Sequence, residues 1–306
     1  MIRIGVDFGG TKIEAAALDA GGGERARLRR PNPGSYEGAI GVVAELVNGV
    51  RQQSGAPHGP VGVGVPGSVS PTTGLMRGAN SVWLNGRDFN ADLTRALGVP
   101  VRLANDANCL ILSEVTDGAA AGVKGSAFGA ILGTGCGGGI AVDGKLLEGA
   151  NGVAGEWGHT PLPWPVEQDK APRCWCGRKG CLETFVSGTA LAADHARVTG
   201  RRMKADEVIA AARTGDRWAA EALDRYIERL GRAFAVVVDL IDPSVIVLGG
   251  GMSNVAELYE DLPGAIAPHV FSDVWSARIV KAAHGDSSGV RGAARLWPLE
   301  PATATA

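Results

Sequence analysis

The sequence predicts a duplicated α/β fold in two lobes that close over a cleft. Each half begins with an apolar strand, a glycine-rich turn and a second apolar strand, at IRIGVDFGGTKIEAAALD (2–19) and AFGAILGTGCGGGIAVDG (127–144). At 306 residues, the chain is long enough for two lobes of ordinary size. We expect a small N-terminal lobe (1–107) completed by a C-terminal helix (287–298), a large lobe (108–286) and a disordered tail (299–306).

The remaining elements follow from hydrophobic periodicity. A helical stretch (36–54) precedes two strands, VGVGVPG (61–67) and VRLAND (101–106), and a helix begins near Asp106. A long helix (216–242) has one buried face, because its apolar residues are spaced by three or four. The strand SVIVLGGG (244–251) ends in a third glycine turn, and a last helix (287–297) packs back onto the first lobe.

Composition narrows the class of protein. A formal net charge of −2 gives no attraction to nucleic acid or to an anionic membrane. The longest charge-free stretch (125–142) has too many glycines for a membrane helix. Because the N-terminus lacks the pattern of an export signal, the cytoplasm is the expected compartment.

Three glycine turns at strand ends indicate a nucleotide. In DFGGTK (7–12), backbone N–H groups freed by glycine, a threonine hydroxyl and a lysine charge suit a phosphate, and Asp7 suits a magnesium-bound water. The alternative is an ordinary tight hairpin turn. GTGCGGG (133–139) and LGGGMSN (248–254) repeat the pattern, and neither is a Rossmann or P-loop fingerprint.

LANDAN (103–108) places Asp106 where a strand meets a helix. From the spacing alone, the favoured interpretation is that Asp106 caps the helix. The functional alternative is a general base that takes a proton from a hydroxyl nucleophile.

Three of the five cysteines cluster near a histidine. His159, Cys174, Cys176 and Cys181 form a complete ligand set for structural zinc. A redox disulfide is the weaker alternative, because no C-x-x-C pair is present. Cys109 is expected to be a small buried residue on a helix, and Cys136 a residue of the glycine turn.

Together, DFGGTK, VPGSV, LANDAN, GTGCGGG, GEWGH, CWCGRKGCLE and VIVLGGG resemble the ROK family of bacterial sugar kinases, in order from residue 3 to about 297. The segments 79–86, 155–164, 188–195 and 284–294 look closest to its fructokinase/mannokinase branch. This resemblance implies an actin-like, two-lobed ATPase fold (a duplicated ribonuclease H-like fold) with a zinc-binding insert in the larger lobe. It also implies ATP- and magnesium-dependent phosphorylation of a hexose on the 6-hydroxyl.

The resemblance assigns roles residue by residue. Asp106 becomes the catalytic base. The sugar-binding positions are Gly67, Asn80, Asn105, Asp106, Glu156, His159 and Glu183. The nucleotide positions are Asp7, Gly9, Gly10, Thr11, Lys12, Gly133, Thr134, Gly135, Gly250 and Gly251. The zinc ligands are His159, Cys174, Cys176 and Cys181. The zinc would then position the sugar-binding loop without acting as a Lewis acid, because its coordination is full.

Some alternatives stay open at this point. Fructose is the expected acceptor, with mannose second, and glucose and N-acetylglucosamine are alternatives within the family. A sugar-responsive regulator without catalysis is an alternative of another class. Only six residues precede Asp7, so the helix-turn-helix found in ROK repressors is not expected. The donor could also be polyphosphate, although the sequence shows no extended Lys/Arg track. The resemblance suggests a homodimer.

Overall fold

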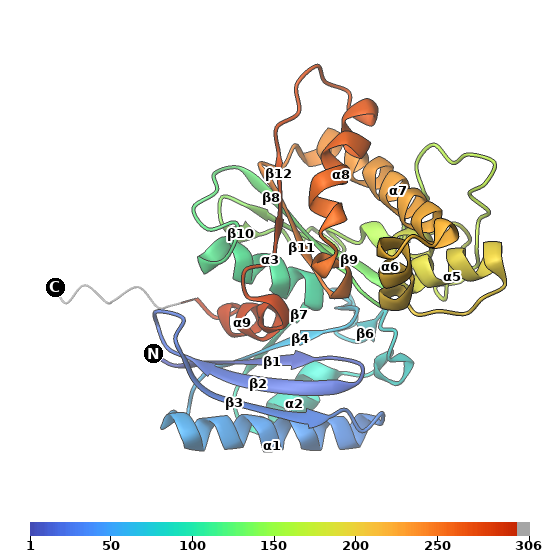
Figure 1. The fold of residues 1–306 in the computed structure, drawn as a ribbon. Coiled ribbons are helices and arrows are strands. Elements are labelled where there is room, and N and C mark those ends of the chain that lie inside the picture. Colours follow the sequence, from blue (N-terminus) through green and yellow to red (C-terminus); the bar gives the residue numbers. More distant parts are fainter. Residues whose placement is uncertain (299–306) are drawn as a thin grey trace. The chain divides into compact units, whose positions relative to one another are not determined.

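The computed structural model describes residues 1–298, so the predicted disordered tail (299–306) lies outside the described residues. The chain forms a mixed α/β structure with two compact units (Figure 1). The first unit comprises residues 1–118, 146–154 and the C-terminal part from 286, and the second comprises 119–145 and 155–285. The predicted lobe boundary after residue 107 remains a prediction.

The strands have the following bounds: β1 Arg3–Phe8, β2 Lys12–Leu18, β3 Glu24–Pro31, β4 Val61–Val65, β5 Ser68–Val69, β6 Met76–Arg77, β7 Val101–Asn105, β8 Ser126–Leu132, β9 Cys136–Val142, β10 Lys145–Leu146, β11 Val245–Gly249 and β12 Arg278–Lys281. The helices are α1 Tyr36–Ser54, α2 Phe89–Leu97, α3 Asp106–Asp117, α4 Glu183–Val186, α5 Gly188–Thr199, α6 Ala205–Arg213, α7 Arg217–Ile241, α8 Glu257–Ile266 and α9 Ser288–Arg295. No helix among residues 1–298 is both long and apolar enough to cross a membrane.

The predicted duplication is confirmed by sheet topology. The first unit has the strand order β3-β2-β1-β4-β7, and the second sheet has β10-β9-β8-β11-β12. In both sheets an antiparallel hairpin, β1–β2 or β8–β9, is extended by two parallel strands. The DFGGTK and GTGCGGG turns therefore each connect the first two strands, in chain order, of a sheet.

In the first unit, successive side chains of a strand point to opposite faces of the sheet, and their sizes decide which helix packs on each face. Ile4, Val6 and Phe8 of β1 belong to the core that includes α1. Gly5 of β1 and Gly62 of β4 lie against the backbone of α9, where a Cβ atom would clash with carbonyl oxygens. These glycines let α9 lie directly on the sheet, and in Figure 1 α9 and α1 cover opposite faces of it.

The core of the second unit is centred on the long helix. α7 ends within one residue of the predicted bounds at both ends, and Asp216 caps it by accepting hydrogen bonds from the N–H groups of Trp218 and Ala219. Its apolar face packs with Phe128 of β8 and with β11, every residue of which is buried. The predicted strand and helix are confirmed.

One predicted turn is shorter than expected. Cys136 is the first residue of β9 and pairs with Leu132, so it is a buried strand residue and not part of the turn. The glycines that follow it have a packing role. A Cβ at Gly138 would come within 2.7 Å of the Gly155 carbonyl oxygen and of the Trp157 ring. The loop that carries GEWGH can therefore lie on β9 only because that strand lacks side chains there.

Candidate active site and metal centre

Acidic and amide side chains gather at the carboxyl ends of parallel strands in the first unit. Asp7 lies near the end of β1, and Asn105 ends β7, which pairs with β4. Asp106 is the first residue of α3. Carboxyl ends of parallel strands are the usual location of ligand sites in α/β sheets. A cavity of about 310 Å³ opens at this edge, and its lining includes Val65, Leu103, Asn105 and Asn108.

Asn105, and not Asp106, occupies the capping position of α3. The side-chain oxygen of Asn105 accepts a hydrogen bond of 2.8 Å from the N–H of Ala107. Asp106 Oδ1 also accepts from this N–H at 2.8 Å. The Asn105 amide in turn donates to the Gly67 carbonyl at 3.2 Å. The expected cap at Asp106 is therefore one position too late, because the strand ends at residue 105 and the extended backbone there suits the cap.

Asp7 has an unusual electrostatic environment. Burial, followed by the negative charge of Asp106, raises the pKa of Asp7 to about 7. Gly289 at the start of α9 allows this arrangement, since a Cβ there would lie 2.8 Å from Asp7 Oδ2. A buried carboxyl group whose pKa is raised further by a neighbouring carboxylate suits a divalent cation, which would offset the repulsion between the two groups.

The first glycine turn, residues 9–12, carries the predicted phosphate-binding residues. Gly10 and Thr11 are exposed, and Lys12 Nζ lies 3.9 Å from the exposed carboxylate of Asp286. Asn32 was not predicted, yet its side chain donates to the Gly9 carbonyl at 2.8 Å and its N–H donates to the Thr11 carbonyl at 2.9 Å. Its only sequence signal was an asparagine beside a proline at a strand end.

Gly67 and Asn80 lie on adjacent backbone segments. Gly67 has φ = +75°, and a Cβ there would lie 2.6 Å from the backbone nitrogen of Ala79. Asn80 is exposed. Asn85, which sequence reasoning missed, holds this segment by two hydrogen bonds of 2.9 Å between its side chain and the backbone of Ala79.

The second unit has a separate cavity at its glycine turns. This cavity has a volume of about 600 Å³, and its lining includes the predicted residues Gly133, Thr134 and Gly251. Gly250, the residue before Gly251, has φ = +78°. A Cβ atom at Gly250 would lie 2.6 Å from the Leu132 carbonyl oxygen. The turn and the N-terminus of α5 are joined by a 2.7 Å hydrogen bond from Gly188 N–H to the Gly133 carbonyl.

Several residues of this cavity were not predicted as site residues. They lie at the starts of α5 and α6, which together with the glycine turns enclose the space: Gly188, Thr189, Met203, Lys204 and Ala205. Their sequence signal was weak, because small and flexible residues at helix starts are common. The volume is within the range of small-molecule sites.

The predicted zinc ligands converge in the second unit. One ligand atom from each of His159, Cys174, Cys176 and Cys181 lies within 4.8 Å of the others. His159 Nδ1 is 3.7 Å from Cys174 Sγ, and Cys176 Sγ is 3.6 Å from Cys181 Sγ. Tetrahedral zinc with thiolate bonds of about 2.3 Å would separate its sulfur ligands by about 3.8 Å. The geometry therefore fits zinc, with His159 Nε2 left for another partner.

Backbone pairing places the two halves of this cluster together. Leu182 N–H donates to the Thr160 carbonyl at 2.8 Å, and Leu162 N–H donates to the Gly180 carbonyl at 3.1 Å. Trp157, buried and stacked on Phe234 with ring centroids 5.0 Å apart, fixes the residues on either side of it. The exposed residue Glu156 is therefore directly followed by a residue whose position is fixed by packing, Trp157.

Glu183 joins the metal cluster to the glycine turn. Its Oε1 accepts a 2.6 Å hydrogen bond from the Trp175 indole, and its Oε2 accepts a 3.1 Å hydrogen bond from the Cys136 N–H. Within the second unit, the structure therefore brings together the predicted zinc ligands, Glu156 and Glu183. Gly67, Asn80, Asn105 and Asp106 belong to the first unit.

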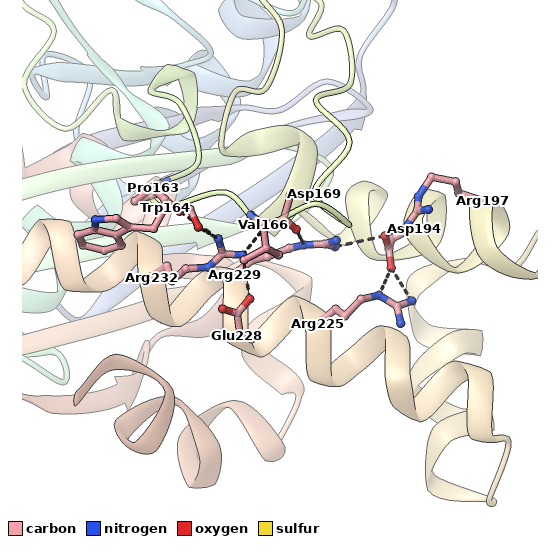
Figure 2. Close-up of polar contacts among 10 residues, drawn as sticks. All are labelled: Pro163, Trp164, Val166, Asp169, Asp194, Arg197, Arg225, Glu228, Arg229 and Arg232. Atoms are coloured by element: carbon pink, nitrogen blue, oxygen red, sulfur yellow. Dashed lines mark hydrogen bonds and ion pairs between the residues drawn. The ribbon is translucent and has the colours of Figure 1, made fainter. Parts of the chain in front are cut away.

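A buried ion-pair network holds the loop between the two segments that carry the predicted zinc ligands. Asp169 accepts from Arg229 at 2.7 Å and from Arg232 at 2.8 Å, and Arg232 also donates to the carbonyls of Pro163 and Trp164. Figure 2 shows these arginines on α7 facing the loop, with Asp194 of α5 beside Arg229. The side chains of Asp169, Arg229 and Arg232 are almost fully buried, and none of them is a predicted zinc ligand.

The match to a family model decides the family. Residues 3–300 match the model of the ROK family, which is nearly the whole chain. The chain belongs to the ROK family.

Curated ROK relatives include the N-acetyl-D-glucosamine kinases of Vibrio parahaemolyticus and Vibrio cholerae. Each is 40% identical over 298 residues, which cover 95% of this chain and 98% of the relative. Among solved structures, a ROK hexokinase from Thermus thermophilus is 32% identical with a TM-score of 0.84, covering 96% of this chain and 97% of that one.

A second solved structure contains ligands. A ROK family glucokinase from Streptomyces griseus, in complex with glucose and AMPPNP, is 28% identical with a TM-score of 0.80, covering 97% of this chain and 99% of that one. These structures confirm the predicted actin-like fold class.

Proposed function

We propose that the protein is an ATP-dependent hexose kinase that phosphorylates the 6-hydroxyl of its acceptor. The observation that carries this proposal is the Asp106 carboxylate at the carboxyl end of β7, beside the capping Asn105, in a chain of the ROK family. The named relatives are sugar kinases, and one of them binds glucose and a nucleotide analogue.

In the proposed reaction, Asp106 accepts the proton of the acceptor hydroxyl. The hydroxyl oxygen forms a bond to the γ-phosphorus as the bond to the β-phosphate oxygen breaks, which releases ADP. Phosphoryl transfer depends mainly on alignment and on neutralising charge. Asp106 is not required to cap α3, because Asn105 occupies the capping position.

Magnesium would neutralise phosphate charge when bound with the nucleotide. Asp7 is the candidate residue to hold it through a water molecule, and its acidic neighbour Asp106 is consistent with a cation here. Gly9, Gly10, Thr11 and Lys12 would contact phosphates. Gly133, Thr134, Gly135, Gly250 and Gly251 would hold the nucleotide at the cavity of the second unit.

Zinc would be structural. Its four ligands would leave no open position for substrate, so its proposed role is to fix the loop that carries Glu156 and Glu183. His159, bound through Nδ1, could offer Nε2 to a sugar hydroxyl.

Two acceptors have support. Segments 79–86 and 155–164 favour fructose, with mannose second. The curated relatives favour N-acetylglucosamine, since those at 40% identity bear that name. Sugar-binding positions common to the family do not separate these acceptors.

The test is ADP release from ATP and magnesium with fructose, mannose, glucose and N-acetylglucosamine in turn, using zinc-loaded protein. Turnover on any hexose that is abolished by Asp106→Asn would support the proposal, and the best acceptor would choose between the two candidates. Absence of turnover on all four by folded, zinc-loaded protein would favour a regulator. A homodimer is the proposed assembly, which light scattering would test.

A further inference from the structure

The carboxylate of Glu183 connects two segments that the proposed function treats separately. One oxygen accepts from the Trp175 indole N–H in the metal-binding segment, and the other accepts from the Cys136 N–H at the end of the glycine turn. A carboxylate has about four acceptor positions. Cys174 Sγ also lies 4.0 Å from Oε1. These contacts fix the orientation of the side chain and still leave an acceptor position for a sugar hydroxyl.

Trp175 is placed by the metal cluster. It lies between the ligands Cys174 and Cys176, and its ring meets the His159 ring edge-on with centroids 5.1 Å apart. Its side chain is nevertheless 50% exposed, so burial does not explain a tryptophan here. The charge-assisted hydrogen bond to Glu183, at 2.6 Å, is its specific interaction with the rest of the unit.

The other end of this connection is the turn that lines the 600 Å³ cavity. On one side, Gly188 N–H donates to the Gly133 carbonyl at 2.7 Å. On the other side, Glu183 Oε2 holds the Cys136 N–H, and a Cβ at Gly135 would lie only 2.5 Å from that oxygen. The carboxylate is therefore packed against Gly135 and Cys136, which directly follow Gly133 and Thr134 along the chain.

We propose that Trp175 and Glu183 are positioning residues through which the metal-binding segment holds the Gly133–Gly135 turn, by way of Cys136 that follows it, in the geometry that binds nucleotide. This inference rests on the proposed nucleotide site. It predicts that the metal affects nucleotide affinity, in addition to the sugar site that His159 and Glu156 would form.

The test compares Trp175→Phe, which keeps an aromatic ring and removes the N–H donor, with Trp218→Phe as a matched control. Trp218 is similarly exposed, at 49%, and lies at the start of α7. We expect Trp175→Phe to weaken ADP binding in calorimetry by about tenfold, with zinc content and melting temperature unchanged and the sugar KM changed less than the ATP KM. Trp218→Phe should match the parent.

Removal of zinc provides a second test of the connection between the metal-binding segment and the nucleotide site. Removing zinc with a chelator should weaken ADP binding in the parent protein by about tenfold and should have little further effect in Trp175→Phe, because the connection is already broken. Glu183→Gln combined with Trp175→Phe should be less than additive on ADP affinity.

Unchanged ADP affinity in zinc-loaded Trp175→Phe, or equal effects of zinc removal in variant and parent, would overturn the inference and leave the proposed function intact. A parent protein that binds no adenine nucleotide would instead overturn the proposed function, and the inference with it.

Discussion

Asn105 and Asp106 divide two tasks between adjacent residues. Asn105 caps α3 and donates to the Gly67 carbonyl, so the orientation of the backbone at the strand end depends on its amide. Asp106 shares the Ala107 N–H through one oxygen. A carboxylate supported in this way can act as a base without being needed to start the helix.

Asp106→Asn is expected to lower kcat by about 10²–10⁴-fold, since general-base catalysis contributes that much. Folding should survive, because Asn105 still caps the helix and an asparagine oxygen can accept from Ala107. Steady-state kinetics with calorimetric binding of sugar and ADP would measure this. Asp88→Asn is the matched control: Asp88 accepts from Ala91 N–H at the start of α2, and its variant should keep full turnover.

Gly67→Ala should destabilise the protein and raise the sugar KM. Gly67 has positive φ, and a Cβ would also collide with backbone of the segment that carries Asn80. Gly74→Ala provides the comparison, because Gly74 has φ = +73° with open space around it. Gly74→Ala should lower the free energy of unfolding by about 1–2 kcal/mol, the cost of placing a residue with a Cβ in the left-handed backbone conformation. Equal losses in denaturant unfolding of the two variants would contradict the steric explanation.

At the scale of elements, the loop between His159 and Cys174 is held by two different kinds of interaction. Its middle is fixed by the Asp169 network on α7, and its ends meet at the metal cluster. The ion pairs involve no predicted metal ligand, whereas the cluster consists of the four predicted ligands. The two can therefore be tested separately.

Asp169→Asn should lower the free energy of unfolding by at most about 3–5 kcal/mol. The buried Arg229 and Arg232 lose their shared carboxylate and keep Asp194 and Glu228, respectively, as ion-pair partners. Glu221→Gln, which removes an exposed ion pair with Arg217, should cost at most about 1 kcal/mol. Urea unfolding of both variants would decide.

The same network predicts a pH dependence. Burial alone would raise the pKa of Asp169, but hydrogen bonds from Arg232, the Val166 N–H and Arg229 together lower the pKa. A lowered pKa stabilises the fold above the unfolded value of about 4, and that stability is lost as pH falls through the folded value. The difference in unfolding free energy between parent and Asp169→Asn should therefore shrink below about pH 4.

Cys176→Ser should reduce bound zinc to well below one ion per chain and raise the sugar KM, because three ligands hold zinc less tightly than four. Metal analysis after dialysis and steady-state kinetics would measure this. Cys109→Ser is a useful contrast, since Cys109 is buried in α3 and is not part of the cluster: it should keep zinc even if it loses stability. Unchanged zinc in Cys176→Ser would rule out the proposed ligand set.

At the scale of the whole molecule, the residues of the proposed reaction are divided between the two units. The proposed base belongs to the first unit, and the cavity at the Gly133 and Gly251 turns belongs to the second. The repeated strand order explains why each unit has its own glycine turn at the equivalent hairpin.

Each ligand alone should therefore stabilise the protein. Saturation at 100 times Kd adds about 2.7 kcal/mol to the free energy of unfolding. Thermal unfolding with ADP and magnesium, and separately with the best hexose, should each raise the melting temperature. Asp106→Asn should keep both shifts, since it removes a catalytic proton acceptor and leaves binding in place. A hexose shift that requires ADP would show that the sugar residues are not a site by themselves.

The sequence by itself determined the elements and the candidate residues whose signals are local. Periodicity located α1 and α7, glycine turns marked the two hairpins, and cysteine spacing predicted the cluster of His159, Cys174, Cys176 and Cys181, whose ligand atoms lie within 4.8 Å of one another. These predictions worked because each depends on neighbours along the chain.

Only the tertiary structure decided which residues that are distant in the sequence are in contact. Cys136 belongs to β9, and Gly138 makes room for the GEWGH loop, which no local pattern reveals. Glu183 accepts from Trp175 and from Cys136, a residue 47 positions away in the sequence. Asn32 and Asn85 brace backbone by hydrogen bonds whose partners are set by the fold. The role of a polar side chain can be assigned only when its hydrogen-bond partners are known. Those partners come from distant parts of the sequence, and the packing of the chain brings them together.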